Sequence, residues 1–260
     1  MKDKNKHFIL LTGGSGNLGS EIVKSKKFKN IVYPSKKKLN ITKFLDVKNF
    51  LLNNNINTII HCAALARMRD CENFKKKAFL INVKGTRNFV KIINKFKLEI
   101  RFIYMSSDAV YAGETGNYSE KSILKPVNYY GLTKYFAERE VKKLKNYVII
   151  RTRFFNKKKI KFKSSAIDSF SSTLEVSKLI KYIKLLVFHN YIGVLNIGSK
   201  RVSDYDAYKK YKKIKPCFRK TIVAKLNFKT SKDSSLDCSV FKKIFYEKKK
   251  GNRYCHTHKK

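Results

Sequence analysis

The stretch LLTGGSGNLGSEI, residues 10–22, decides the fold class of this chain. It overlaps the apolar run of residues 7–12 and leads into a segment with helical periodicity. Gly13, Gly16 and Gly19 fall at this junction with the spacing of a nucleotide-binding loop. Glycines let the backbone approach a pyrophosphate, and the free N–H groups of a helix N-terminus attract it. The stretch therefore predicts a dinucleotide-binding loop rather than a plain turn.

Short β-branched runs alternate with longer amphipathic segments along the rest of the chain. The runs predict buried strands at 7–12, 30–34, 57–63, 100–107, 147–152 and 193–198. The segments between them predict helices at 18–28, 43–54, 73–97, 132–145, 175–188, 204–213 and 238–247. Strands that alternate with helices pair in parallel through right-handed crossovers. We therefore expect an α/β fold, a Rossmann-type doubly wound parallel sheet with a small C-terminal substrate-binding lobe.

No internal repeat or low-complexity linker divides the 260 residues, and 43% apolar content is enough for a well-buried core. We expect residues 1–152 to form the nucleotide-binding domain and to carry the catalytic residues. Residues 153–247 would form a shortened substrate lobe interwoven with the sheet, and residues 248–260 a basic tail.

The charge is strongly positive, with 60 Lys and Arg against 18 Asp and Glu, a formal net charge of +42. Such a surface suggests nucleic acid or an anionic membrane as a partner. Only ten of the basic residues are Arg, and the lysines are scattered through every expected helix instead of forming one stripe. Base readers favour Arg forks and aromatic stacking platforms. We therefore expect no nucleic-acid partner and regard an anionic small ligand as the natural one.

No apolar stretch approaches the ~20 residues that span a bilayer, and the glycine loop follows the N-terminus too closely to leave room for a signal peptide. The five cysteines lack Cys-x-x-Cys spacing, which argues against a disulfide framework and a thiolate zinc site. Cys255, His256 and His258 near the C-terminus are more typical of a polar chain end than of a metal site. We expect a cytoplasmic protein with no metal and no membrane partner.

The second expected strand runs into YPSKKKLN, residues 33–40. An acid at its end would bind the ribose 2′-hydroxyl of NAD, but no acid occurs from residue 33 until Asp46. Ser35, Lys36 and Lys37 would instead bind a 2′-phosphate. The sequence therefore favours NADP(H) over NAD(H).

Tyr130 and Lys134 stand four residues apart and would share one helix face. A Lys ammonium stabilises a phenolate, and acid–base work near neutrality asks for a Tyr pKa lower by about three, equivalent to about 4 kcal/mol. Ser107 follows the expected fourth strand, where its hydroxyl could hydrogen-bond the reacting oxygen. Each residue alone has an ordinary structural interpretation, but together, after a nucleotide loop, they predict a catalytic set.

Five motifs occur in a fixed order: TGGSGNLG (12–19), HCAA (61–64), NVKGT (82–86), SSDAVY (106–111) and YYGLTK (129–134). In this order and at these separations the chain resembles the extended short-chain dehydrogenase/reductases, and within them the dTDP-4-dehydrorhamnose reductases. The resemblance implies a nicotinamide cofactor and the reduction of a 4-keto nucleotide sugar. It also implies that Tyr130 protonates the sugar oxygen, Lys134 holds the nicotinamide ribose, and Asn82 shapes the helix beside the site.

The resemblance implies cofactor contacts at Gly13, Gly16, Asn17, Leu18, Gly19, Ser35, Lys36, Asn40, Ile41, Cys62, Ala63, Ala64, Asn82, Tyr130 and Lys134. It implies substrate contacts at Met68, Arg69, Asp108 and Arg153. Three features depart from the family. Asn40 replaces an acid, and the segment 153–170 is shorter than the usual substrate-binding insertion. Ala66, Met68 and Arg69 stand where other side chains usually line the cofactor and sugar cleft.

The expected function is therefore an NADP(H)-dependent reductase of a keto nucleotide sugar or a related keto substrate, with a homodimer left open. Two alternatives remain. An epimerase or dehydratase of the same family would show no net consumption of its cofactor. A non-catalytic NADP-binding regulatory subunit, the role of a similar fold in a methionine adenosyltransferase complex, would bind the cofactor without turnover.

Overall fold

The computed structural model describes residues 7–245, and its core is one sheet of six parallel strands. In spatial order these are β2 (Ile31–Val32), β1 (Ile9–Thr12), β3 (Thr58–His61), β4 (Arg101–Met105), β5 (Tyr147–Arg151) and β10 (Gly193–Asn196). The order reverses between β1 and β3, and such a reversal opens a ligand-binding crevice at the carboxyl ends of the strands. The expected doubly wound α/β fold is confirmed.

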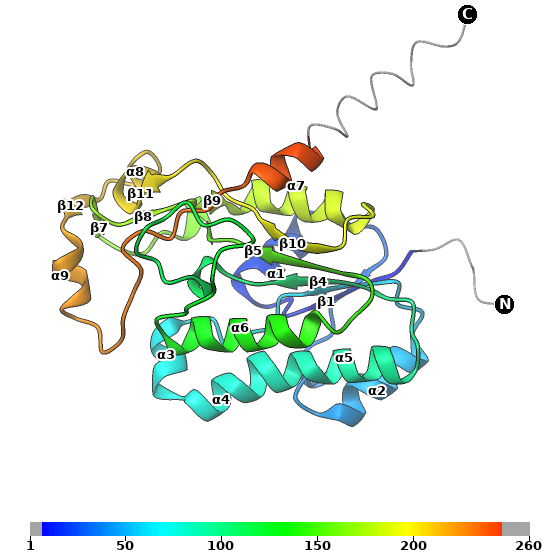
Figure 1. Cartoon of the computed structure of the whole chain (residues 1–260). Helices are drawn as coiled ribbons and strands as arrows, with labels where there is room; N and C mark the ends of the chain where they lie inside the picture. The colour runs from blue at the N-terminus through cyan, green and yellow to red at the C-terminus, as the bar shows by residue number, and fades with distance from the viewer. Residues whose placement is uncertain (1–6, 246–260) are drawn as a thin grey trace, which may run out of the picture.

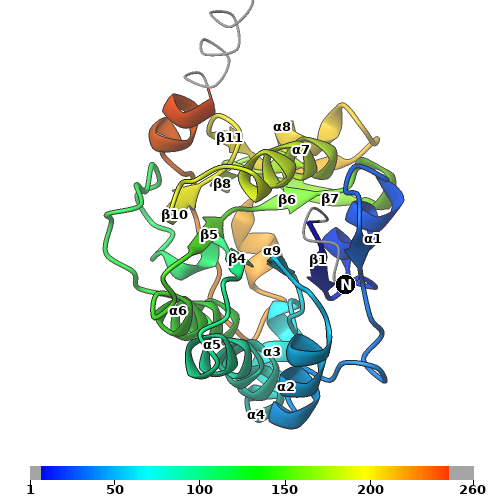
Figure 2. The same cartoon turned by 90° about the vertical axis from the view of Figure 1, so that its right-hand side faces the viewer.

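Helices cover both faces of the sheet (Figures 1 and 2). One face packs against α1 (Asn17–Lys24), α7 (Val176–Val187) and the helical residues 239–245. The other packs against α2 (Phe44–Asn53), α5 (Gly85–Lys95) and α6 (Tyr129–Val141). The side chains of each strand alternate between the two cores, so that Ile9 and Leu11 join the first and Leu10 the second.

The single helix expected at 73–97 is divided into several pieces. The chain forms α3 (Met68–Asn73), α4 (Lys75–Phe79), a π-helical turn (Leu80–Lys84) and then α5. Phe74 interrupts the helix between α3 and α4, because its φ of −125° and ψ of 55° are not helical. Apolar periodicity does not reveal the π turn, which is a feature frequent at functional sites.

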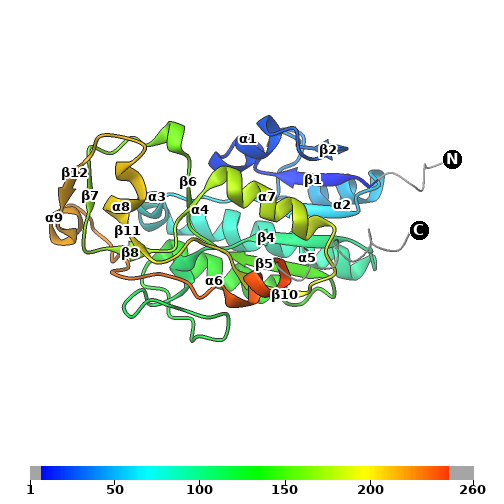
Figure 3. The same ribbon diagram turned by 90° about the horizontal axis from the view of Figure 1, so that it is seen from above.

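A small lobe lies beyond the carboxyl ends of the sheet strands (Figures 1 and 3). It contains three two-stranded pairs: β6 (Phe154–Phe155) with β9 (Leu174–Glu175), β7 (Ser164–Ala166) with β12 (Lys215–Cys217), and β8 (Phe170–Ser171) with β11 (Val202–Ser203). The short helices α8 (Asp204–Lys209) and α9 (Arg219–Val223) complete it. Strands of two or three residues are too short to leave a periodic signal in the sequence.

Within residues 7–245, no helix is long and apolar enough to cross a bilayer. The same residues contain no group of three or more His, Cys, Asp or Glu side chains arranged to hold a metal ion. The expected basic tail, with Cys255, His256 and His258, lies outside the described residues. The domain boundaries stay a prediction, and β10 from the second expected domain joins the sheet of the first.

Candidate active site

The glycine loop between β1 and α1 has no room for side chains. Gly13 has a φ of +72°, and a Cβ there would lie 2.7 Å from the backbone nitrogen of Ala63. A Cβ on Gly19 would overlap the carbonyl oxygen of Gly13. The Gly16 amide donates to that same oxygen at 2.9 Å, which closes the turn. Only glycine at these positions leaves the backbone bare toward the crevice.

The N-terminus of α1 is free to bind an anion. Gly16 occupies the N-cap without a side-chain cap, and the first turn holds no acid. Asn17 is the first helical residue, whereas Leu18 is buried in the core. The loop after β3 forms the other wall. Its Cys62 and Ala63 amides bond the carbonyl and hydroxyl of Thr12 at 3.3 Å each, and Ala64 follows. The structure thus brings these predicted residues together in a cradle that fits a dinucleotide pyrophosphate.

The turn after β2 adjoins the glycine loop. A Cβ on Gly14 would lie 3.1 Å from the Tyr33 side chain, two residues before the exposed Ser35 and Lys36. The next predicted residue, Asn40, makes hydrogen bonds within the protein. Asn40 Oδ1 accepts hydrogen bonds from the amide and the hydroxyl of Thr42, at 3.1 and 2.9 Å.

Ile41, the next residue, packs on α5. A Cβ on Gly85 would lie 2.8 Å from Ile41 Cδ1, so the glycine makes room for this side chain. The Ile41 carbonyl also accepts from Asn88 Nδ2 at 2.8 Å. These contacts fix the segment that follows the exposed turn.

Ser107 and Tyr130 meet at the carboxyl end of β4. Ser107 caps the 3₁₀ turn Asp108–Val110, where its hydroxyl accepts from the Ala109 amide at 3.2 Å. That hydroxyl also donates to Asp108 Oδ1 at 3.1 Å, and Ser107 and Tyr130 line the same cavity. Asn128 caps α6 by accepting from Gly131 N at 2.9 Å, which places Tyr130 in the first turn of the helix.

The Tyr130 hydroxyl is a protonated phenol at neutral pH in the free protein. Burial raises its pKa above the ordinary value of 10, and the hydrogen bond with Ser107 opposes that rise. The Asp108 carboxylate raises the pKa further, and the Arg153 guanidinium lowers it. This direction is opposite to the lowering that acid–base work near neutrality asks for, so in the free protein the phenol keeps its proton.

Lys134 lies one turn further along α6 and is buried, with 3% of its surface exposed. Its ammonium is 4.1 Å from the centroid of the Tyr104 ring. Burial lowers the pKa of Lys134 to about 8, and the Glu138 carboxylate opposes this effect. The action of Lys134 on the Tyr130 hydroxyl stays a prediction.

The buried Lys134 makes stability depend on pH. Between about pH 8 and its ordinary pKa of 10.5, the unfolded chain keeps a proton that the folded chain has released. The free energy of unfolding therefore rises with pH in this window, and Lys134→Met removes the rise. Urea titrations of both proteins from pH 7 to pH 10 check this; a wild-type-minus-variant difference that stays flat would contradict it. Lys142→Met, at the exposed C-cap of the same helix, serves as the control.

Asn82 in the π turn clamps the two walls of the site together. Its Oδ1 accepts from the Leu65 amide at 2.7 Å, and its Nδ2 donates to the Leu65 carbonyl at 3.0 Å. The same Nδ2 donates to Thr133 Oγ1 at 2.9 Å, and Thr133 Oγ1 donates to the Tyr130 carbonyl at 2.7 Å. Asn82 thus ties the loop after β3 to the first turn of α6.

A cavity of about 410 Å³ lies in front of Ser107 and Tyr130. Of the predicted substrate residues, Met68, Asp108 and Arg153 line it. Arg69 is exposed and does not line the cavity.

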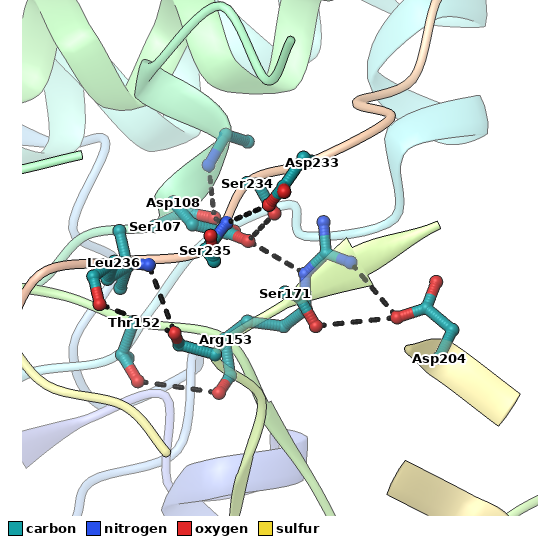
Figure 4. A network of polar contacts seen from close by, with 12 residues as sticks. Ser107, Asp108, Thr152, Arg153, Ser171, Asp204, Asp233, Ser234, Ser235 and Leu236 are labelled. Atoms are coloured by element: carbon teal, nitrogen blue, oxygen red, sulfur yellow. Dashed lines mark hydrogen bonds and ion pairs between the residues drawn. The ribbon is translucent and has the colours of Figure 1, made fainter. Parts of the chain in front are cut away.

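Arg153 lies between two carboxylates, with Nε 2.8 Å from Asp108 Oδ2 and Nη1 3.7 Å from Asp204 Oδ1 (Figure 4). Ser234 Oγ donates to Asp108 Oδ2 at 2.6 Å. Sequence reasoning did not find Asp204, Ser234 or Arg219, the last of which also lines the cavity. For Asp204, the sequence signal was the preceding Ser203, which is the N-cap of α8. An N-cap residue predicts where a helix begins and says nothing of a ligand.

Comparisons with known proteins find relatives in sequence and in fold. The family model of the RmlD substrate binding domain matches residues 7–175. A dTDP-4-keto-6-deoxy-D-glucose reductase of Streptomyces niveus is 31% identical over 135 residues, 51% of this chain and 46% of the relative. Methionine adenosyltransferase 2 subunit beta of Xenopus laevis is 34% identical over 146 residues, 51% of this chain and 42% of the relative. The matched region thus spans about half the length of these curated relatives.

A solved dTDP-4-dehydrorhamnose reductase of Bacillus anthracis, in complex with NADP, shares the fold over nearly the whole chain. The TM-score is 0.80 at 24% identity, with 90% of this chain and 91% of the other covered.

Proposed function

The chain belongs to the family of the RmlD substrate binding domain, and on this premise we propose that it reduces a 4-keto nucleotide sugar with NADP(H). The observation that carries the proposal is that Ser107 and Tyr130 line one cavity of a protein whose glycine loop leaves its backbone bare. The Streptomyces relative, named for a dTDP-4-keto sugar, supports the substrate class.

Each residue of the proposed site has its own part in the reaction. The cofactor, when bound, supplies a hydride. Tyr130 donates its phenolic proton to the carbonyl oxygen. In the free protein the single proton of the Ser107 hydroxyl goes to Asp108 Oδ1 at 3.1 Å, and in the proposed complex it turns to the carbonyl oxygen instead. Lys134 holds the cofactor ribose and favours the phenolate that Tyr130 leaves behind.

The two parts of the chain share the site in this proposal. Residues 1–152 carry the cofactor, Ser107, Tyr130 and Lys134, and residues 153–247 bind the sugar. The lining of the cavity supports this division, because Arg153, Asp204 and Arg219 come from the second part.

The test is a turnover assay with purified protein, NADPH and a dTDP-4-keto-6-deoxy sugar. The proposal expects NADPH absorbance to fall in step with the appearance of the reduced sugar. An epimerase or dehydratase would change the sugar with no net loss of NADPH. The likeness to methionine adenosyltransferase 2 subunit beta favours a second candidate, a regulatory subunit. In that case NADPH would raise the melting temperature without any turnover.

Lys36 should set the preference for NADPH. We expect Lys36→Met to raise the Kd for NADPH about tenfold, because a 2′-phosphate loses one charged partner, and to leave the Kd for NADH unchanged. Fluorescence titration with both cofactors measures this. Lys29 is an exposed lysine that precedes β2 in the sequence, and Lys29→Met should change neither Kd. An equal loss for both cofactors would refute a contact with the 2′-phosphate.

A further inference from the structure

A second cavity, of about 530 Å³, opens at the N-terminus of α1. One wall is Asn17, the first residue of that helix, and another is Arg67 from the loop after β3. The third is the segment of residues 154–162, which we call the basic segment. It follows β5 and lies beside α1, in light green in Figure 3.

The basic segment is held in place by contacts on both of its sides. Lys159 forms a 3.0 Å ion pair with Glu21 of α1. The Phe155 and Phe162 rings pack on Tyr208 of α8, with centroids 5.1 and 4.9 Å away. Lys212 Nζ donates to the Ile160 carbonyl at 2.8 Å. These contacts fix the distance between the segment and the helix N-terminus.

The charges of this cavity are all positive. Its lining holds Arg67, Lys159 and Lys161 and no acid. Glu21 neutralises Lys159 from outside the lining. For Arg67 and Lys161, the described part of the chain offers no side-chain hydrogen bond or ion pair. Two unbalanced cations thus stand beside a helix terminus that is itself positive, an arrangement that an anion would stabilise.

We propose that Arg67 and Lys161 bind the diphosphate of the dinucleotide from the side opposite α1. The inference rests on the proposed function, because the glycine loop places the diphosphate at Gly16 and Asn17. The diphosphate fits better than the 2′-phosphate, since Ser35 and Lys36 lie in the turn after β2 and do not line this cavity. The basic segment would thus add affinity for NADPH and NADH alike.

The test measures the Kd of NADPH and of NADH by fluorescence titration for Arg67→Met, Lys161→Met and the double variant. Each single change is expected to raise both Kd values about tenfold, and the double change to raise them further. Added KCl should weaken binding less in the double variant than in the wild type, because fewer charges are screened. Lys158→Met is the matched control, since Lys158 is in the same segment but lines a different cavity.

The outcomes separate the two proposals. Unchanged Kd values in the double variant would overturn the role of Arg67 and Lys161 while leaving the proposed function intact. A loss for NADPH alone would also overturn it, because that pattern assigns the cations to the 2′-phosphate. A wild type that binds neither cofactor would overturn the proposed function and this inference with it. Both residues are exposed, so melting temperatures should stay at the wild-type value.

Discussion

Tyr130→Phe should lower kcat for keto-sugar reduction about a thousandfold and leave the Kd for NADPH within about twofold. The substitution removes only the hydroxyl of a residue that lines the cavity beside Ser107. The ring and the start of α6 remain, because Asn128 caps the helix independently. Steady-state kinetics and a cofactor titration on the same preparation measure both quantities.

The neighbouring Tyr129 provides the matched control for this substitution. It lies in the same turn of α6, but its ring faces the Lys75 ammonium at 5.7 Å and does not line the cavity. Tyr129→Phe should therefore keep kcat near the wild-type value. If Tyr130→Phe kept more than a tenth of wild-type kcat, Tyr130 would not be the proton donor.

Arg151→Met should lower the free energy of unfolding by about 3–5 kcal/mol, the usual effect of leaving one member of a buried ion pair without its partner. Arg151 and Glu138 are each 1% exposed, and Nη2 lies 2.7 Å from Glu138 Oε2. Ser106 Oγ donates to the other carboxylate oxygen at 2.5 Å. Arg151 Nη1 also donates to the Tyr111 hydroxyl at 2.8 Å. The pair therefore ties α6, the helix that carries Tyr130 and Lys134, to the ends of β4 and β5.

Urea unfolding at neutral pH measures this loss, with Lys143→Met as the control. Lys143 also pairs with a glutamate of α6, Glu140, at 2.8 Å, but its side chain is 59% exposed. An exposed pair contributes less than about 1 kcal/mol, so the control should be nearly as stable as the wild type. Similar losses in the two variants would mean that burial does not determine how much the Arg151–Glu138 pair contributes to the free energy of unfolding.

The sequence predicted the sheet and the cofactor loop because both depend on local patterns. Short apolar runs identified all six sheet strands, and the glycine spacing located the start of α1 to within one residue. The π turn at Asn82 was not predictable, because it is maintained by hydrogen bonds to Leu65 and Thr133, 17 and 51 residues away. The resemblance implied a role for Asn82 beside the site, but the geometry of this residue comes from tertiary contacts.

The cavity was harder to predict than the catalytic residues. The resemblance implied a substrate contact for Arg153. In the structure both Arg151 and Arg153 pair with carboxylates: Arg151 is buried against Glu138, whereas Arg153 pairs with Asp108 and also lines the cavity. Helical spacing likewise placed Lys134 on the face of Tyr130 but could not reveal that the Tyr104 ring lies under its ammonium. Periodicity identifies a face, and the neighbours on that face come from other strands and helices.

The most direct test of the central claim follows the hydride. Purified protein is given NADPH deuterated at its transferable position together with a dTDP-4-keto-6-deoxy sugar, and the sugar is analysed by mass spectrometry. The account predicts one deuterium on the former carbonyl carbon for each NADPH consumed, and an incorporation rate lower by about a thousandfold with Tyr130→Phe. A protein that binds the labelled cofactor but leaves the sugar without deuterium would contradict the account.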